Sequence, residues 1–184
     1  EDLKDLRMVS SVSDYDGDGD VAEGVYYEIE GLKEQLYAAI QAYAADKAGT
    51  ALIYESHTYP YFFTDTNADG EVQDDEANYG NKYATWTPNL LKAAFNYQMA
   101  SKDPGNFAHG GKYTIQLLVD SIEVVGGDVS GLARSDAGHF AGNTEAFRHW
   151  DEDGEVPGSC AKCHSATGLP EVIAEGANLS NEVA

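Results

Sequence analysis

Residues 23–45 read EGVYYEIEGLKEQLYAAIQAYAA and carry the clearest helical pattern in the chain. Apolar side chains recur there at intervals of three and four residues: Val25, Ile29, Leu32, Leu36, Ile40 and Tyr43. This spacing places them along one face of an α-helix. The pattern therefore predicts an amphipathic helix of about six turns over 23–45.

A second helix is expected over 87–101. Thr87 offers an N-cap hydroxyl, Pro88 suits the first helical position, and the sequence DPG at 103–105 stops the helix. The residues that fall near its apolar face are Leu91, Phe95, Gln98 and Met99.

A third helix is expected over 112–125, with a periodic apolar face and two glycines at its C-terminal exit. That face consists of Ile115, Leu118 and Ile122. Between the first two helices, the sequences ALIYES (51–56) and TYPYFF (58–63) are apolar and aromatic enough for short extended segments. The fold class predicted is mainly α, with little regular β structure.

The chain is strongly acidic. Its 184 residues hold 11 Lys and Arg against 32 Asp and Glu, a formal net charge of −21. Such a charge repels nucleic-acid phosphates and anionic membrane surfaces, and it attracts metal ions and basic partners. No apolar run approaches the roughly 18 residues of a membrane span. Because the chain begins at Glu1 rather than Met, we expect a processed protein or part of a longer one.

The stretch TDTNADGEVQDDE at 64–76 matches the twelve-residue calcium loop of EF-hand proteins. Calcium takes six to eight hard oxygen ligands, which alternate residues of a tight turn can supply, and Gly70 permits that turn. Counted from Asp65 as position 1, the expected ligands are Asp65, Asn67, Asp69, the carbonyl of Glu71, and Glu76.

A similar stretch, SDYDGDGDVAEGV, precedes the first helix at 13–25. Its expected ligands are Asp14, Asp16, Asp18, Asp20 and Glu23. Position 12 is Val25, and the nearest glutamates are Glu23 and Glu28, so either Glu23 closes a shortened shell or the site is weak. Together the loops predict two calcium ions in EF-hand-like sites. Paired loops would bring their position-8 valines, Val21 and Val72, into a short strand contact.

The only two cysteines lie in SCAKCHS at 159–165. A zinc site would need further ligands, and a thioredoxin-like redox pair would need a βαβ pattern that the chain lacks. A Cys-x-x-Cys-His sequence instead indicates covalent attachment of haem c, with thioethers at Cys160 and Cys163 and a proximal iron bond from His164. Such attachment occurs outside the cytoplasm, which predicts a periplasmic or extracellular protein. The chain would then divide into a helical calcium-loop domain over 1–130 and a haem-attachment segment over 131–184 packed on it.

The sixth iron ligand is expected to be His149 or His139, which lie shortly before the cassette. His149 stands among aromatic residues in FRHW, although such a histidine is often simply packed or hydrogen-bonded. The remaining candidates are His109, His57, Met8 and Met99; among these His57 is expected to be structural and Met99 to belong to the core.

Three stretches make the sequence resemble a known family: 59–98, 107–123 and 146–165. They are similar to a calcium-loop-bearing region of large bacterial multihaem c-type cytochromes, which are exported electron-transfer proteins. The resemblance implies bis-histidine haems stacked for electron conduction. This chain departs from the pattern because it has a single CxxCH, which suits one module of a longer polypeptide or a reduced relative.

The function that these features favour is electron transfer rather than catalysis. The expected partners are other haem proteins or haem modules, and neighbouring copies of the chain. Two alternatives remain: a haem enzyme of the peroxidase or reductase type, which needs an open iron position, and a calcium-dependent structural or assembly domain.

Overall fold

The computed structural model describes residues 2–6 and 13–133. All of them belong to one unit, Glu1–Ala133. The predicted haem-attachment segment, with Cys160, Cys163 and His164, lies outside the described residues, and so do His139 and His149. The division of the chain near residue 130 therefore stays a prediction.

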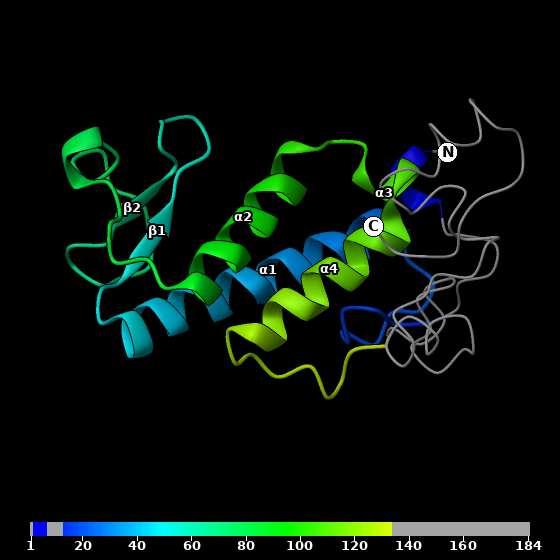
Figure 1. Cartoon of the computed structure of the whole chain (residues 1–184). Coiled ribbons are helices and arrows are strands. Elements are labelled where there is room, and N and C mark those ends of the chain that lie inside the picture. Colours follow the sequence, from blue (N-terminus) through cyan, green and yellow to red (C-terminus); the bar gives the residue numbers. More distant parts are fainter. Residues whose placement is uncertain (1, 7–12, 134–184) are drawn as a thin grey trace, which may run out of the picture. The chain divides into compact units, whose positions relative to one another are not determined.

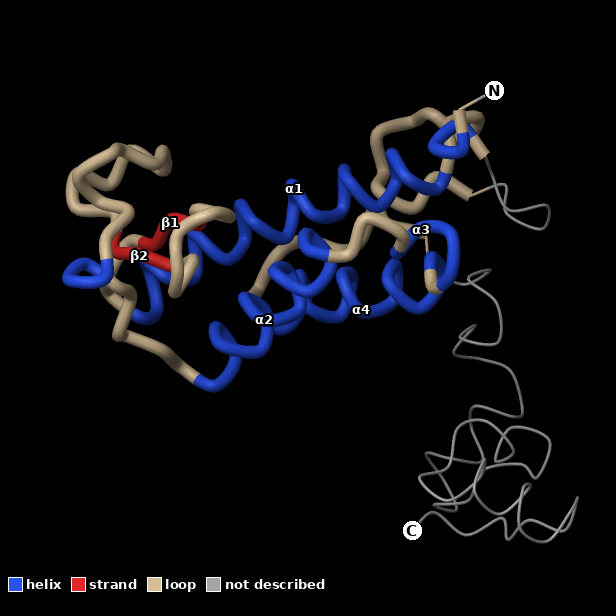
Figure 2. The backbone as a smooth tube through the Cα atoms, turned by 90° about the horizontal axis from the view of Figure 1, so that it is seen from above, coloured by secondary structure: helices blue, strands red, loops and turns tan. Residues whose placement is uncertain are grey.

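Three helices form the core of this unit: α1 (Val25–Tyr43), α2 (Pro88–Lys102) and α4 (Gly111–Val124). Each of them packs against the other two (Figures 1 and 2). The apolar face of α1 is buried as its spacing predicts, through Val25, Ile29, Leu32, Leu36 and Ile40. The helix runs on through a π-helical turn (η2, Ala44–Ala48) and ends at Gly49, whose φ of +74° suits a residue without a side chain.

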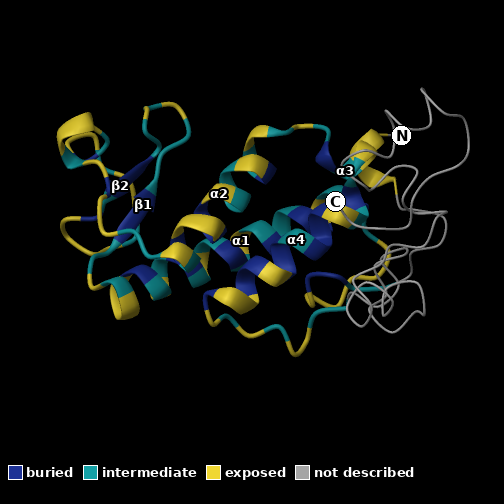
Figure 3. Cartoon of the chain, viewed as in Figure 1, coloured by how far each residue is buried: buried dark blue, intermediate teal, exposed yellow. Residues whose placement is uncertain are grey.

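Helix α2 begins as expected, but its expected apolar face is wrong. The hydroxyl of Thr87 accepts a hydrogen bond from the N–H of Leu90 at 3.2 Å, which caps the helix. Leu91 and Phe95, however, are exposed to 52% and 65%, as the yellow outer side of α2 in Figure 3 illustrates. The buried side chains are instead Leu90, Ala93, Ala94 and Ala100. Small side chains such as alanine leave room for neighbouring helices to pack closely, which is a physical reason for this face to turn inward.

Helix α4 buries its predicted apolar face, which consists of Ile115, Leu118 and Ile122. The break at 103–105 is confirmed, because α2 ends at Lys102 and a single turn, α3 (Asn106–His109), precedes α4. Two short 3₁₀ helices complete the helical structure of the described residues, η1 (Leu3–Asp5) and η3 (Tyr79–Asn81).

The two extended segments form an antiparallel hairpin of β1 (Leu52–Tyr54) and β2 (Phe62–Thr64), with Ile53 paired to Phe63. It lies beyond the C-terminal end of α1 (Figure 1). The predicted class, mainly α with little regular β structure, is confirmed. Among the described residues, no helix combines the length and the apolar composition that a lipid bilayer requires.

Two leucine-to-alanine substitutions test how this core is packed. Leu118 is fully buried between helices, whereas Leu91 lies on the exposed face of α2. Leu118→Ala should lower the free energy of unfolding by about 2–5 kcal/mol, because it leaves a cavity, and Leu91→Ala by less than about 1 kcal/mol. Chemical denaturation followed by circular dichroism measures both. Equal losses would contradict the assignment of the buried face of α2.

Candidate metal sites in two acidic loops

The first acidic loop, residues 13–24, is shaped by hydrogen bonds between its own aspartates and its backbone. The Asp14 carboxylate accepts from the N–H groups of Gly17 (2.6 Å) and Gly19 (2.8 Å), and the two glycines have φ values of +80° and +98°. Asp16 Oδ1 accepts from Asp18 N–H at 3.2 Å. Asp18 Oδ1 in turn accepts from the N–H of Asp20 at 2.7 Å. The alternate aspartates are thus gathered along one tight turn.

The second loop, residues 65–76, repeats this pattern position by position. Asp65 accepts from the N–H groups of Ala68 (2.6 Å) and Gly70 (2.8 Å), at positions whose φ values are +58° and +82°. The remaining bonds run from Asp69 N–H to Asn67 Oδ1 (3.0 Å) and from Glu71 N–H to Asp69 Oδ1 (2.9 Å). Two segments with different side chains at several positions therefore adopt the same hydrogen-bonded loop.

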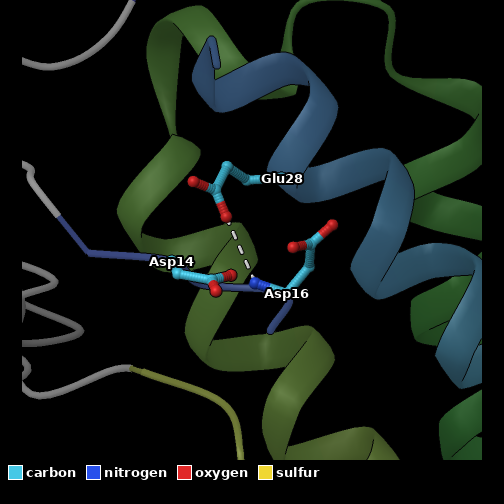
Figure 4. A group of neighbouring side chains, drawn as sticks. All are labelled: Asp14, Asp16 and Glu28. Atoms are coloured by element: carbon cyan, nitrogen blue, oxygen red, sulfur yellow. Dashed lines mark hydrogen bonds between the residues drawn. The ribbon is translucent and has the colours of Figure 1, made fainter. Parts of the chain in front are cut away.

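Each loop is closed by a buried glutamate that accepts from the N–H at loop position 2. In the second loop, Glu76 Oε1 accepts from Thr66 N–H at 2.7 Å. In the first, Glu28 Oε2 accepts from the N–H groups of Tyr15 (2.6 Å) and Asp16 (3.1 Å), as Figure 4 illustrates for Asp16. Glu28 therefore has the same place in the first loop as Glu76 has in the second.

The sequence pattern named Glu28 as a glutamate near position 12 but favoured Glu23 as the closing ligand, because Glu28 lies three residues beyond that position, inside α1. The sequence does contain a feature that indicates a special role for Glu28. Glu28 precedes Ile29 on the apolar side of the helix and is fully buried, and a charged residue in such a place needs polar partners.

The structure brings the carboxylates of the first loop close together. One oxygen from each of Asp14, Asp16 and Glu28 lies within 4.8 Å of the others, and the same holds for Asp16, Asp18 and Glu23. The expected ligand Glu23 thus joins the cluster. Asp20 does not belong to either group, and its carboxylate accepts from Ala22 N–H at 2.8 Å. In the second loop of the described region, no three carboxylates meet this distance.

Burial and mutual repulsion raise two pKa values in the first loop. Burial is the largest cause for Asp16, whose pKa rises to about 6, and the charges of Asp18 and Glu28 add to it. The pKa of Glu23 rises to about 7, first through burial and then through neighbouring carboxylates, beginning with Asp16. These two groups are more easily protonated than ordinary acids, because burial and the neighbouring carboxylates both disfavour their charged forms. A bound cation would favour the charged forms.

The second loop has the opposite electrostatic character. Hydrogen bonds from the Thr66 hydroxyl and N–H lower the pKa of Glu76. The pKa of Asp69 is lowered chiefly by the hydrogen bond from the N–H of Glu71, and further by the side chains of Gln73 and Asn67. Glu76 is only 3% exposed, and its Oε2 is buried without a hydrogen-bond partner. A buried carboxylate oxygen without a donor is costly, and a metal ion is one ligand that would satisfy it.

The two loops do not pair in the manner of an EF-hand pair. The first contacts Glu28 near the N-terminal end of α1, and the second contacts Gln41 near its other end, where Gln41 Nε2 donates to Gly70 O at 3.0 Å. Val21 and Val72, which pairing would bring together, are both exposed. The second loop also follows β2 rather than a helix. The expected valine contact is wrong, because α1 separates the loops.

Of the candidate sixth iron ligands, His57, His109 and Met99 fall within the described residues. His57 Nδ1 lies 3.0 Å from Glu55 Oε1 and His109 Nε2 lies 3.3 Å from Asp103 Oδ1, and both side chains are largely exposed. Met99 lies on the outer face of α2, so its expected place in the core is wrong. Met8, like the preferred histidines and the CxxCH residues, is outside the described part.

No protein-family model and no solved structure matches the chain. Proteins of similar sequence include cytochromes of Geobacter sulfurreducens. The C-type polyheme cytochrome OmcC of strain ATCC 51573 / DSM 12127 / PCA is 32% identical over 107 residues, which cover 52% of this chain and 14% of the relative. The C-type polyheme cytochrome OmcB of strain DL-1 / KN400 is 31% identical over 101 residues, covering 50% and 13%.

The chain thus spans about one seventh of the length of these curated relatives, since the aligned shares are 14% and 13%. The alignments extend over half of the chain, far more than a single haem cassette occupies. Over about half of its length, the chain is related to polyhaem c-type cytochromes.

Proposed function

We propose that the chain is an electron-transfer module of a multihaem c-type cytochrome, with one covalently bound haem and two calcium-binding loops. The observation that carries this proposal is the combination of a CxxCH cassette at 160–164 with relatives named as polyhaem cytochromes. The cassette is a motif of five consecutive residues, whereas the alignments span about a hundred residues, so the relationship extends well beyond the cassette.

The haem would be held by Cys160 and Cys163 through thioethers and by His164 at the iron. Covalent attachment allows a chain to hold haem without enclosing it in a large apolar pocket. Because such attachment takes place outside the cytoplasm, a periplasmic or extracellular location follows. The electron donors and acceptors would be other haem modules, other haem proteins or neighbouring copies of this chain.

His139 or His149 would supply the sixth ligand to the iron. Two histidine ligands leave no open position for a substrate, so a six-coordinate haem serves electron transfer rather than peroxidase or reductase chemistry. Both histidines precede the cassette by a short stretch of chain, which could place either of them against the distal side of the haem.

The first calcium ion would be bound by the carboxylate cluster of Asp14, Asp16, Asp18 and Glu23, closed by Glu28, with Asp20 at loop position 7 as a further ligand outside that cluster. The second would be bound by Asp65, Asn67, Asp69, Glu71 and Glu76. Two observations support these sites: both segments adopt the same loop around a buried closing glutamate, and that glutamate in the second loop has an unsatisfied buried oxygen. Calcium prefers such all-oxygen shells. Its charge would also offset the repulsion within each loop.

Covalent haem is tested on the exported protein. The intact chain should be heavier than its amino-acid sequence by the mass of one haem in denaturing mass spectrometry, because thioether bonds survive unfolding. Cys160→Ala together with Cys163→Ala should abolish this mass increase, and His57→Ala, a histidine substitution elsewhere, should preserve it. An unmodified wild-type chain would disprove the haem assignment.

The sixth iron ligand is tested by replacing His139 and His149 separately. One of the two alanine variants should change a low-spin spectrum into a high-spin one that responds to carbon monoxide, because the iron loses a strong ligand. The other variant and His57→Ala should retain the wild-type spectrum. If the wild-type haem itself binds carbon monoxide readily, the bis-histidine assignment fails and the enzyme alternative gains support.

The calcium sites are tested by three glutamate-to-glutamine substitutions. Glu28→Gln should weaken the first site and Glu76→Gln the second, because an amide still accepts the backbone hydrogen bonds but loses the ligand charge. Glu34→Gln, on the exposed side of α1, should leave both unchanged. At a hundredfold excess of calcium over Kd, each site stabilises the fold by about 2.7 kcal/mol.

Isothermal titration calorimetry and melting curves with and without a chelator measure these effects. Melting curves that are identical in calcium and in chelator, together with no bound calcium by elemental analysis, would remove both sites from the proposal.

A further inference from the structure

We propose that Asn81 is a positioning residue that holds the second calcium loop closed before the ion binds. Asn81 lies five residues beyond the loop, so no ligand pattern includes it. The inference rests on the calcium function proposed above for residues 65–76.

The side-chain amide of Asn81 joins the two ends of the loop. Its Nδ2 donates to Thr64 O at 2.7 Å and to Glu76 O at 3.0 Å. Thr64 is the residue before the first ligand, and Glu76 is the last ligand. A single amide group, with two N–H bonds, thus ties the backbone at the start of the loop to the backbone at its end.

Asn81 is itself held firmly in place. Its N–H donates to Asn78 O at 2.9 Å, and Asn78 Oδ1 is within 3.2 Å of the same nitrogen. The next residue, Lys82, forms a bridge with Phe63 of β2, and Tyr83 N–H donates to Phe62 O at 3.0 Å. The hairpin therefore fixes the backbone that carries Asn81. The side-chain amide of Asn81 in turn fixes both ends of the loop.

This connection provides a constraint on the two loop ends that EF-hand loops obtain from their flanking helices. There, a helix on each side sets the distance between the first and the last ligand. Here β2 leads into the loop, and only the three-residue helix η3 follows it. Among the described residues, Asn81 is the one residue whose side chain forms hydrogen bonds with the backbone at both ends of the loop.

The closed loop leaves Glu76 prepared for an ion. Glu76 Oε1 is occupied by Thr66 N–H, while Oε2 is buried and has no hydrogen-bond partner. Asn81 fixes the backbone of this same residue. At the far side of the loop, Gln41 Nε2 donates to Gly70 O at 3.0 Å, so the turn is also held to α1. Binding would then cost little ordering of the loop, which favours affinity.

The first loop provides an internal comparison, because α1 closes it directly. Glu28 bonds to Tyr15 and Asp16, and Gln35 Nε2 donates to Asp16 O at 2.5 Å. Loss of the Asn81 amide should therefore weaken one calcium site and leave the other unchanged.

The experiment titrates calcium into the haem-loaded full chain by calorimetry, with Glu76→Gln used to identify the second site. Asn81→Leu keeps the side-chain size and removes the donors. Asn89→Leu is the matched control, since Asn89 Nδ2 also donates to a backbone carbonyl, that of Val124 at 3.5 Å, away from both loops. We expect Asn81→Leu to weaken the second site about tenfold. The first site, and both sites of Asn89→Leu, should keep wild-type Kd values.

Europium luminescence supplies a readout that a purely structural role would not change. The number of water molecules on the bound ion should rise in Asn81→Leu, because Glu76 no longer closes the shell, and should stay constant in Asn89→Leu. A lower melting temperature of Asn81→Leu with an unchanged Kd would overturn the proposal and leave Asn81 a structural residue.

Failure of this inference is distinct from failure of the proposed function. If the wild-type chain binds no calcium in its second loop, the calcium function of that loop fails and this inference with it. If the wild type binds and Asn81→Leu binds equally well, only the role of Asn81 is overturned. Should Asn81→Leu not fold, Asn81→Ser is measured instead, and if neither folds in excess calcium, Asn81 is required for the fold and the positioning role is overturned.

Discussion

The contact between α1 and the loop before it is the constraint on which the rest of this unit depends. The side chain of Glu28, in α1, is fully buried and accepts hydrogen bonds from the N–H groups of Tyr15 and Asp16. Gly31 lies where α1 meets the loop, and there is no room for a side chain at this position, because a Cβ atom at Gly31 would lie 1.8 Å from Asp16 Oδ2. One helix therefore both builds the apolar core and shapes an acidic site, and glycine in mid-helix, normally unfavourable, is the residue that fits there.

The sequence predicts the helices well because their apolar spacing is a local property. The buried face of α2 is predicted wrongly because local properties, here residue size and hydrophobicity, do not decide it. Leu91 and Phe95 are larger and more apolar than the alanines that are buried in their place, and residue type alone favours them for the core. The outcome depends on how closely three helices can approach, which is a property of the assembled unit.

The acidic loops divide in the same way. Their turns could be predicted, because each bond links residues two, three or five positions apart. The contacts of Glu28 and Asn81 could not, since they join a loop to a helix or to a later segment, outside the spacing of any ligand pattern. The CxxCH cassette is the reverse case: the pattern is contained in five consecutive residues, so it can be recognised without knowledge of the fold.

The attachment of the loops at opposite ends of α1 has an electrostatic consequence. Glu28 and Gln41 are thirteen residues apart on one helix, which corresponds to about 20 Å along its axis. At physiological ionic strength, charge interactions across solvent decay over about 8 Å. Two divalent ions so separated would hardly repel each other, and neither loop shares a ligand with the other. If both loops bind calcium as proposed, each would fill according to its own Kd and without cooperativity, so the two sites would lose their ions in separate steps wherever their Kd values differ.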